Sequence, residues 1–201
     1  MKILAGTLIT NGNEVHLLKR RESLGCFDDM NALRCHLAKL AYIPDGDWSD
    51  FRRGSLSVQR LMPAAVLTAG DYGTPLPEDT GVIGWNGDGC TAENLRFWQD
   101  YIQNGRQNGR GGLFVATLPT IPYCEAAITL GCKGSAAYFR TKASTSALFR
   151  LLKARPAGFY LIGEIAAEQV CMLLLETGGS HPLPPDCPSL SSLFALLEKD
   201  L

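Results

Sequence analysis

Residues 81–85 read GVIGW and are followed directly by the glycine-rich turn NGDG at residues 86–89. An unbroken apolar run closed by a turn is typical of a strand that is buried on both faces of a sheet. Residues 91–103, TAENLRFWQDYIQ, space their apolar side chains three and four positions apart, which predicts an amphipathic helix with Thr91 as its cap. A buried strand that leads through a turn into a helix is the basic unit of an α/β fold.

The same alternation of strand and helix extends along the chain on both sides of this unit. Four more segments are expected to be strands: residues 2–10, 135–141, 157–164 and 168–176. Five more have the apolar spacing of helices: residues 28–41, 55–69, 123–131, 142–154 and 189–201. Pro63 lies inside one of these helices and predicts a kink. We therefore expect an α/β fold with a mixed sheet of about five strands packed by helices.

Length and composition fit one globular domain. The chain has 201 residues, of which 46% are hydrophobic and 19% charged, so it has enough apolar surface to bury a core. We expect residues 1–178 to form this domain and residues 179–201 to form a proline-rich linker and a C-terminal helix. The apolar face of that helix must be buried on something, and its residues are Leu190, Leu193, Phe194 and Leu197.

Charge and hydropathy argue against several classes of partner. Nineteen basic and twenty acidic residues give a net charge of -1, which lacks the electrostatic footprint of nucleic-acid or anionic-membrane binding. No apolar run reaches the roughly 18 residues that span a bilayer, and the first residues lack the cleavage site of a signal peptide. We expect a cytoplasmic protein with no membrane span and no nucleic-acid partner.

The cysteine and histidine patterns predict neither a metal site nor a cofactor. The seven cysteines form no CxxC pair, and the three histidines form no HExxH pattern. The glycine-rich segments at residues 86–89 and 104–112 do not match a phosphate-binding loop. We expect the cysteines to be reduced and partly buried thiols.

The order of motifs between Asp79 and Glu176 resembles the N-terminal half of a β-ketoacyl synthase of the thiolase-like superfamily. In that family, a buried strand leads to a glycine-rich turn, and a Leu-Pro or Met-Pro motif opens a helix that ends in a glycine turn. The next strand delivers a Ser-Thr-Ala-Cys nucleophile motif at the head of a buried helix. The counterparts here are Leu118–Pro119 and the turn Gly131–Gly134. The resemblance implies one half of a thiolase-like fold.

Within this superfamily, the chain looks most like the shorter synthase-like domains of aryl-polyene and related polyketide pathways. The resemblance lies in the motifs DTGV at residues 79–82 and TLP at residues 117–119, and in the loop IPDGDWSDFRRGSLSVQR at residues 43–60. That group includes partners of the chain-length-factor type, which lack the cysteine. The resemblance therefore admits a member without catalytic activity.

The family's nucleophile can be located by counting along the chain. In the family, the cysteine follows the second glycine of the turn at a fixed distance, and the same count from Gly134 leads to Ala143. Thr141 falls on the threonine of the motif, Lys142 replaces its alanine, and Ser144 follows. A cysteine at this point would attack an acyl thioester, whereas alanine has no nucleophilic group. A shift of one residue would offer Ser144, but no general base is evident beside it.

A second deficit concerns the rest of the catalytic machinery. The family takes two histidines and a lysine from a C-terminal half that repeats the fold, and too few residues follow Glu176 to form that half. His181 lies in the proline-rich segment and matches no motif. Lys142 would place a cation at a helix N-terminus, so we expect it to be exposed or paired.

Three functions follow from the resemblance. The first is a noncatalytic partner or scaffold that associates with itself or with a full-length ketoacyl synthase through residues 135–141, while Arg52 and Arg53 could contact an acidic acyl carrier protein. The second is an acyl-transfer enzyme that uses another cysteine, Cys90 or Cys124. The third is an acyl-chain binding module with a cavity near Ala143, lined by Leu118, Phe139 and Phe149.

Overall fold

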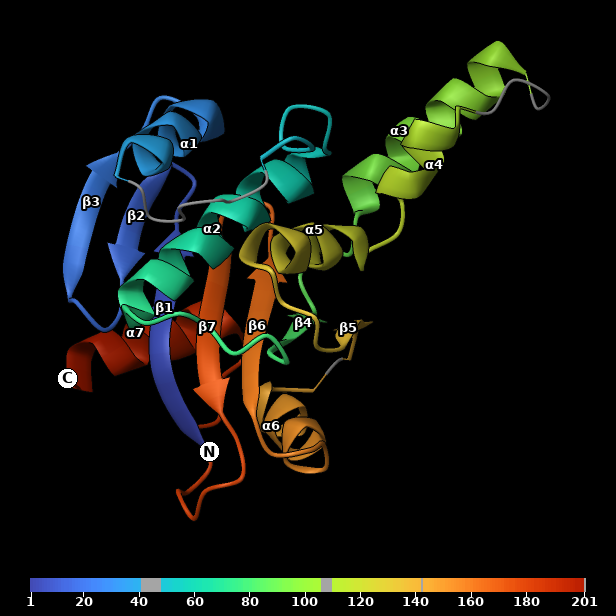
Figure 1. The fold of residues 1–201 in the computed structure, drawn as a ribbon. Coiled ribbons are helices and arrows are strands. Elements are labelled where there is room, and N and C mark those ends of the chain that lie inside the picture. The colour runs from blue at the N-terminus through green and yellow to red at the C-terminus, as the bar shows by residue number, and fades with distance from the viewer. Residues whose placement is uncertain (41–47, 106–109, 142, 201) are drawn as a thin grey trace.

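The computed structural model describes residues 1–40, 48–105, 110–141 and 143–200, and it contains one sheet with strand order β3-β2-β1-β7-β6-β4-β5 (Figure 1). The strands are β1 (Lys2–Ile9), β2 (Glu14–Leu17), β3 (Glu22–Cys26), β4 (Gly81–Trp85), β5 (Ala136–Phe139), β6 (Phe159–Ile165) and β7 (Val170–Glu176). β4 pairs in parallel with β5 and β6. β7 runs antiparallel to both β6 and β1, so the sheet is mixed, as expected.

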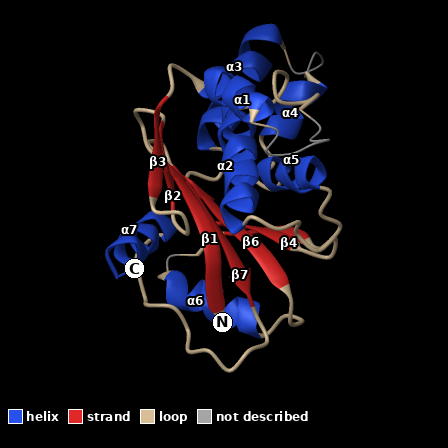
Figure 2. Ribbon diagram, turned by 60° about the vertical axis from the view of Figure 1, so that its left-hand side comes forward, coloured by secondary structure: helices blue, strands red, loops and turns tan. Residues whose placement is uncertain are grey.

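Helices cover both faces of this sheet and make three layers (Figure 2). The helices are α1 (Met30–Lys39), α2 (Leu56–Tyr72), α3 (Thr91–Asn104), α4 (Gly111–Ala116), α5 (Ile121–Leu130), α6 (Thr145–Lys153) and α7 (Leu190–Asp200). α1, α2 and α5 pack on one face, while α6 and α7 pack on the other. Among the described residues, no helix is both long and apolar enough to span a membrane.

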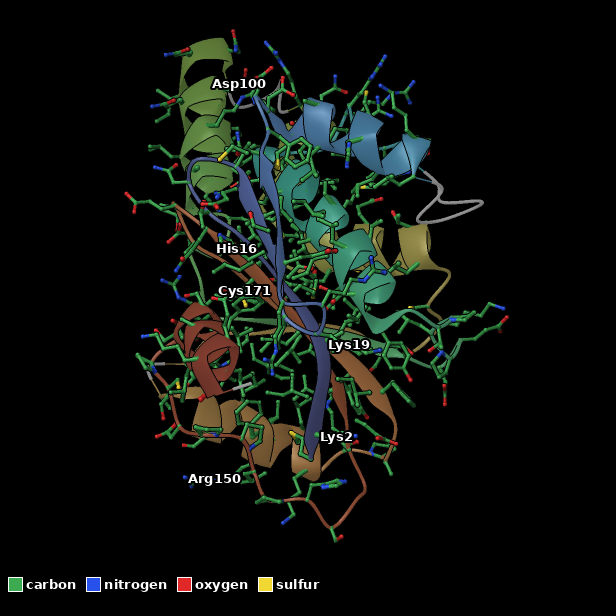
Figure 3. The ribbon with its side chains drawn as sticks, turned by 90° about the vertical axis from the view of Figure 1, so that its left-hand side faces the viewer. Lys2, His16, Lys19, Asp100, Arg150 and Cys171 are labelled. Carbon is green, nitrogen blue, oxygen red and sulfur yellow. The ribbon has the colours of Figure 1, made fainter. Side chains whose placement is uncertain are left out.

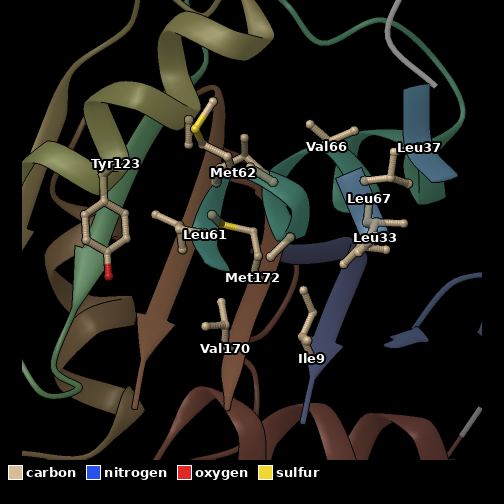
Figure 4. Packing of buried hydrophobic residues seen from close by; sticks show 14 of the residues in the cluster. Ile9, Leu33, Leu37, Leu61, Met62, Val66, Leu67, Tyr123, Val170 and Met172 are labelled. Carbon is tan, nitrogen blue, oxygen red and sulfur yellow. The ribbon is translucent and has the colours of Figure 1, made fainter. Parts of the chain in front are cut away.

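The alternation of side chains along the central strands builds both cores. In β7, Met172 and Leu174 point toward α2, and Figure 4 shows Met172 beside residues of that helix. Leu173 and Leu175 point to the opposite face, toward α6 and α7. Successive side chains of a strand alternate between faces, so a strand covered on both sides must be apolar throughout. This explains why the central strands are recognisable in the sequence as continuous apolar runs.

The α/β class and the five predicted strands are confirmed, but the predicted number of strands is wrong, because the sheet has seven. The two missed strands, β2 and β3, form a hairpin that extends the sheet beyond β1. Their segments, EVHL and ESLGC, are short and mix polar with apolar residues, so they carry no clear strand period. The six-residue helix α4 is missed as well, because it begins at two glycines.

A buried carboxylate attaches the N-terminal hairpin to the helical layer. Asp71, in the last turn of α2, is only 1% exposed. Its oxygens accept hydrogen bonds from the backbone N–H groups of Gly6, at 3.1 Å, Lys19, at 2.9 Å, and Arg20, at 3.0 Å. Lys19 lies in the turn that links β2 to β3, and it is labelled in Figure 3. These bonds satisfy the buried charge and fix the hairpin against α2.

The C-terminal segment packs against the body of the molecule. Leu190, Leu193 and Phe194 of α7 are fully buried on the second face of the sheet. The N-terminal ammonium group donates a hydrogen bond of 2.9 Å to the carbonyl of His181. The predicted apolar face of α7 therefore has its partner, while the domain boundary at residue 178 stays a prediction. Within α2, the helix continues through the buried Pro63 as far as Tyr72.

Candidate functional site

The carboxyl ends of β4, β5 and β6 meet at one edge of the sheet, because these strands are parallel. In open α/β sheets this edge is the usual place for a ligand or a reaction. The turn after β4 has a left-handed backbone, with φ of 47° at Asn86, 65° at Gly87 and 58° at Cys90. A Cβ atom on Gly87 would lie 2.0 Å from the carbonyl oxygen of Ile165, so the turn can approach the end of β6 only with glycine there.

A cavity of about 570 Å³ lies against this turn. Its walls come from the start of α2, the turn after β4, the start of α3 and the residues that follow β6. Arg60 reaches across it and donates hydrogen bonds to the carbonyls of Ala166, at 3.1 Å, and Ala167, at 3.0 Å. Burial lowers the pKa of the Arg60 guanidinium, and the nearby Asp88 opposes this shift. Arg60 thus holds the segment after β6 in place.

Two tyrosines in the wall of the cavity are also engaged with the backbone. Tyr123 donates from its hydroxyl to the carbonyl of Gly163 at 3.1 Å, and Tyr138 donates to the carbonyl of Asn86 at 2.7 Å. Burial raises the pKa of both hydroxyls. Both groups therefore stay protonated near neutral pH and connect the strand ends through structural hydrogen bonds.

The two cysteines considered as alternative nucleophiles lie near this region. Burial, with a smaller effect of Glu93, raises the pKa of the Cys90 thiol to about 11. Burial and the neighbouring Glu125 raise the pKa of the Cys124 thiol as well. A thiol with a pKa near 11 is a thiolate in only about one molecule in ten thousand at pH 7. The surroundings of Cys90 and Cys124 thus favour the unreactive form.

The predicted nucleophile position, Ala143, lies in the connection between β5 and the head of α6. Its backbone N–H donates to the Thr141 hydroxyl at 3.0 Å, and the Thr141 N–H donates to the side-chain oxygen of Asn86 at 2.8 Å. These bonds attach the connection to the turn after β4. Lys142 falls outside the described residues, so its predicted exposure or pairing stays a prediction. Ala143 is exposed and has only a methyl group to present.

The head of α6 is closed by the protein's own C-terminal segment. The N–H of Thr145 donates to the carbonyl of Cys187 at 2.9 Å, and the N–H of Cys187 donates back to the Thr145 hydroxyl at 2.8 Å. The N–H of Ser146 donates to the Asp186 carboxylate at 2.9 Å. An oxyanion at a helix N-terminus needs free N–H donors, and here Thr145 and Ser146 already use theirs.

Asp186 also decides the state of the neighbouring serine. The hydrogen bond from the Ser144 hydroxyl, followed by the one from the Ser146 backbone, lowers the pKa of the Asp186 carboxyl. A carboxylate with a lowered pKa is a poor base for removing a proton from a hydroxyl. Its position instead matches that of a capping group that balances the positive end of the helix. We therefore interpret Asp186 as a cap of α6.

The three residues of the predicted acyl cavity differ in their burial. Phe149 is fully buried in the core between the sheet and α6, and Phe139 packs partly buried against the same core. Leu118 belongs to the connection between α4 and α5 and is 41% exposed. The cavity that the sequence predicts near these residues and Ala143 stays a prediction, while Phe149 and Phe139 contribute to the packing of α6.

The predicted basic pair is exposed in the turn before α2. Arg53 lines a second cavity, of about 460 Å³, together with Arg96 of α3 and Arg110 at the start of α4. Arg110 also forms an ion pair with Asp100 at 3.3 Å. Arg96 and Arg110 could not be found from the sequence, because the three arginines are far apart along the chain and come together only when α3 and α4 fold. Glu93 lines the same groove, so three arginines outnumber one carboxylate there.

A buried acid at the end of β6 also belongs to this region and is not marked by any motif in the sequence. Glu164 is 9% exposed, and its carboxylate accepts a hydrogen bond of 2.7 Å from the N–H of Leu190, the first residue of α7. Burial raises the pKa of Glu164, and the backbone hydrogen bonds oppose this shift. The only signal in the sequence was an acidic residue inside an apolar strand. Glu164 fixes the start of α7 and thereby the segment that closes α6.

Solved structures of known proteins share this fold. One is a chain of the complex of the ketosynthase ApeO with its chain length factor ApeC from Xenorhabdus doucetiae, with 14% identity and a TM-score of 0.59. The match covers 98% of this chain and 91% of that chain, so the two have similar lengths. Another is the ishigamide ketosynthase/chain length factor, with 15% identity and a TM-score of 0.57, where the match covers 91% of this chain and 63% of that chain. No protein-family model and no curated protein matches the sequence.

These matches define the class of the fold, which is the fold seen in these ketosynthase/chain length factor structures. The resemblance to β-ketoacyl synthases, predicted from the order of motifs, is thereby confirmed at the level of the fold. At identities of 14% and 15% the likeness concerns the architecture, and the function has to be argued from the site itself.

Proposed function

We propose that this chain is a noncatalytic ketosynthase-like subunit that acts as a partner or scaffold in fatty-acid or polyketide-type biosynthesis of the aryl-polyene kind. The observation that carries the proposal is the head of α6. The position of the family's nucleophile is Ala143, and the first N–H donors of the helix are occupied by Cys187 and Asp186. An acyl thioester would find there neither a thiolate nor a free oxyanion hole.

The surroundings of the other candidate nucleophiles support the same proposal. The raised pKa of Cys90 and Cys124 argues against the alternative of an acyl-transfer enzyme with a displaced cysteine. The alternative of an acyl-chain binding module has less support, because the Phe149 side chain is fully buried in the core that packs α6 on the sheet. We therefore favour a role in binding another protein over a role in catalysis.

The free edge of the sheet is the surface at which we expect a ketosynthase, or a second copy, to bind. In the part of the chain that the structure describes, β5 ends the sheet and pairs only with β4. Val82 donates to Ser135 and Asn86 donates to Phe139, so the backbone polar groups of Ala136 and Tyr138 face the open edge. An exposed strand edge of this kind is a template for pairing with another chain. Arg52 and Arg53 remain our candidates for contact with an acidic carrier protein.

Incubation with octanoyl-coenzyme A followed by mass spectrometry of the intact protein tests the absence of catalysis. We expect no acyl adduct. A stoichiometric adduct that disappears in the Cys90→Ala or Cys124→Ala variant would overturn the proposal in favour of an enzyme.

Co-expression with the full-length ketosynthase encoded nearest to this chain tests the partner role. We expect co-purification of the two proteins, and we expect Ala136→Pro to abolish it, since proline removes the outward-facing N–H while the pairing with β4 remains. Ala136→Val retains that N–H and serves as the matched control. Failure of the ketosynthase to co-purify would overturn the heteromeric role.

A further inference from the structure

A cavity of about 330 Å³ lies at the C-terminal end of α6. We name it the α6 cavity. Its walls come from the residues that end and follow α6 and from the turn that follows β7, close to the N-terminus (Figure 1). Because α6 begins just after Ala143 and ends at Lys153, the cavity and the counterpart of the nucleophile lie at opposite ends of this helix.

The charged and titratable side chains that line the α6 cavity are all basic. They are Lys153, Arg155 and His181. Among the described residues, no aspartate or glutamate lines the cavity. Basic groups that gather in a hollow without a carboxylate create a positive potential there and attract anions.

The helix itself does not use these basic side chains to close its end. The last carbonyls of α6 accept hydrogen bonds from the backbone N–H groups of Ala154 and Arg155. Within the described part of the chain, the Lys153 ammonium group has neither a hydrogen bond nor an ion pair. The Arg155 side chain donates to the Ser135 hydroxyl at 2.9 Å and lies 5.6 Å from the centre of the Phe139 ring. A guanidinium group has five N–H donors, so these contacts hold Arg155 in place and leave donors for a ligand.

The turn after β7, TGGSH at residues 177–181, forms the other wall and is fixed by hydrogen bonds. The Thr177 N–H donates to the carbonyl of Gly158 at 2.9 Å, and the Gly158 N–H donates to the Thr177 hydroxyl at 3.1 Å. Gly178 has a φ of 96°, and a Cβ atom there would lie 2.4 Å from that of Ala157. Only glycine therefore allows the turn to pass this close to the residues that follow α6.

The same turn offers two consecutive backbone donors. In the segments that the structure describes, the N–H groups of Gly178 and Gly179 donate no hydrogen bond to the protein. The His181 ring lies beside them, since a Cβ atom on Gly179 would be 3.2 Å from its Cδ2. Successive N–H groups in a turn that contains a left-handed residue form a concave site for an anion.

We propose that the α6 cavity binds the phosphate group of a small phosphate monoester. Lys153 and Arg155 supply two positive charges, and a phosphate monoester carries about -1.5 to -2 at neutral pH. A carboxylate would balance only one of the two cations. The volume of about 330 Å³ lies at the lower end of the range for small-molecule sites, so it leaves room for an organic part next to Leu183.

Titration of the isotope-labelled full-length chain with glycerol phosphate, at constant ionic strength and followed by NMR of the backbone amides, tests the proposal. We expect the resonances of Gly178 and Gly179 to shift and to saturate. Lys153→Gln should raise the dissociation constant about tenfold, because it removes a charged hydrogen bond, while Lys153→Arg should retain binding. Lys153 is exposed, so both variants should keep the circular dichroism of the wild type.

The matched control is Lys39→Gln. Lys39 is the exposed last residue of α1, as Lys153 is of α6, but it does not line the α6 cavity. Its loss should leave the dissociation constant within about twofold, because distant exposed charges are screened by salt. Shifts that do not saturate, or a dissociation constant that Lys153→Gln leaves unchanged, would overturn the site.

Two further ligands define the chemistry of the site. Acetate at the same ionic strength should leave both glycine resonances in place, and binding of acetate as tight as that of glycerol phosphate would overturn the selection of phosphate. Inorganic phosphate that binds as tightly as glycerol phosphate would overturn the organic ester as the ligand. None of these titrations involves a ketosynthase, so their failure and the failure of the proposed function are distinguishable.

Discussion

The head of α6 and the exposed face of α3 are both places where the chain could bind another molecule. They differ in whether the chain's own residues cover them. At α6, the residues from Pro185 to Cys187 fold back and occupy the hydrogen-bond donors of the helix. At α3, three large apolar side chains remain exposed. By the resemblance to β-ketoacyl synthases, the head of α6 is the counterpart of the nucleophile position, and there the chain's own residues occupy the N–H donors of Thr145 and Ser146. The difference teaches that a helix end can be satisfied within the chain while an apolar helix face is left exposed.

The largest expected effect on stability comes from truncating a buried aromatic side chain of α7, with the same truncation on the exposed face of α3 for comparison. Phe194 of α7 is fully buried, so Phe194→Ala should lower the free energy of unfolding by about 3–5 kcal/mol. The Trp98 ring is 56% exposed and meets Tyr101 edge-on at 5.7 Å, so Trp98→Ala should lower the free energy of unfolding by only about 0.5–1.5 kcal/mol.

Denaturant titrations at a protein concentration low enough to keep the chain monomeric would measure both values. Working at low concentration separates the stability of one chain from the association of two. Similar losses in the two variants would show that the Trp98 side chain is packed as tightly as that of Phe194, contrary to its exposure.

A smaller effect is expected at the reciprocal hydrogen bonds that close α6. Thr145→Val keeps the shape of the side chain but removes the hydroxyl that accepts from the N–H of Cys187, and it should cost about 1–3 kcal/mol, because that buried N–H is left without its partner. Thr145→Ser retains the hydroxyl and is the matched control. Hydrogen exchange at Cys187, measured by NMR, should accelerate in the valine variant alone. Unchanged exchange there would mean that the segment is held by α7 and not by α6.

The strands that lie between two helical layers could be predicted because burial on both faces requires an uninterrupted apolar sequence. GVIGW at residues 81–85 and VCMLLLE at residues 170–176 show this pattern. The hairpin of β2 and β3 could not be predicted in the same way, because it lies at the edge of the sheet and needs few apolar residues.

The residues of the candidate site also fall into two groups, those that a local motif locates and those that only the fold brings together. Ala143 and Thr141 follow one another in the chain, so a motif locates them. By contrast, the closing contact joins Ser146 to Asp186, and the basic groove joins Arg53, Arg96 and Arg110. These residues are far apart in the sequence and become neighbours only when α7, α3 and α4 have folded into place. A local pattern contains no information about such contacts, whereas the order of motifs did indicate the fold.

The smallest expected effect is the pH dependence of the closing contact. The hydrogen bonds from Ser144 and Ser146 lower the pKa of Asp186 from its ordinary 3.8, so the carboxylate is the form that stabilises the folded protein. Its contribution should be fully present above the unfolded-state pKa and should be lost as the pH falls through the lower pKa of the folded state. The wild type should therefore be slightly more stable than Asp186→Asn at pH 6, and the difference should shrink below pH 3.8. Thermal unfolding of the two proteins across this range would measure it. A difference that does not change with pH would show that Asp186 acts through its shape alone, and the head of α6 would then be closed by Cys187 without the help of a charge.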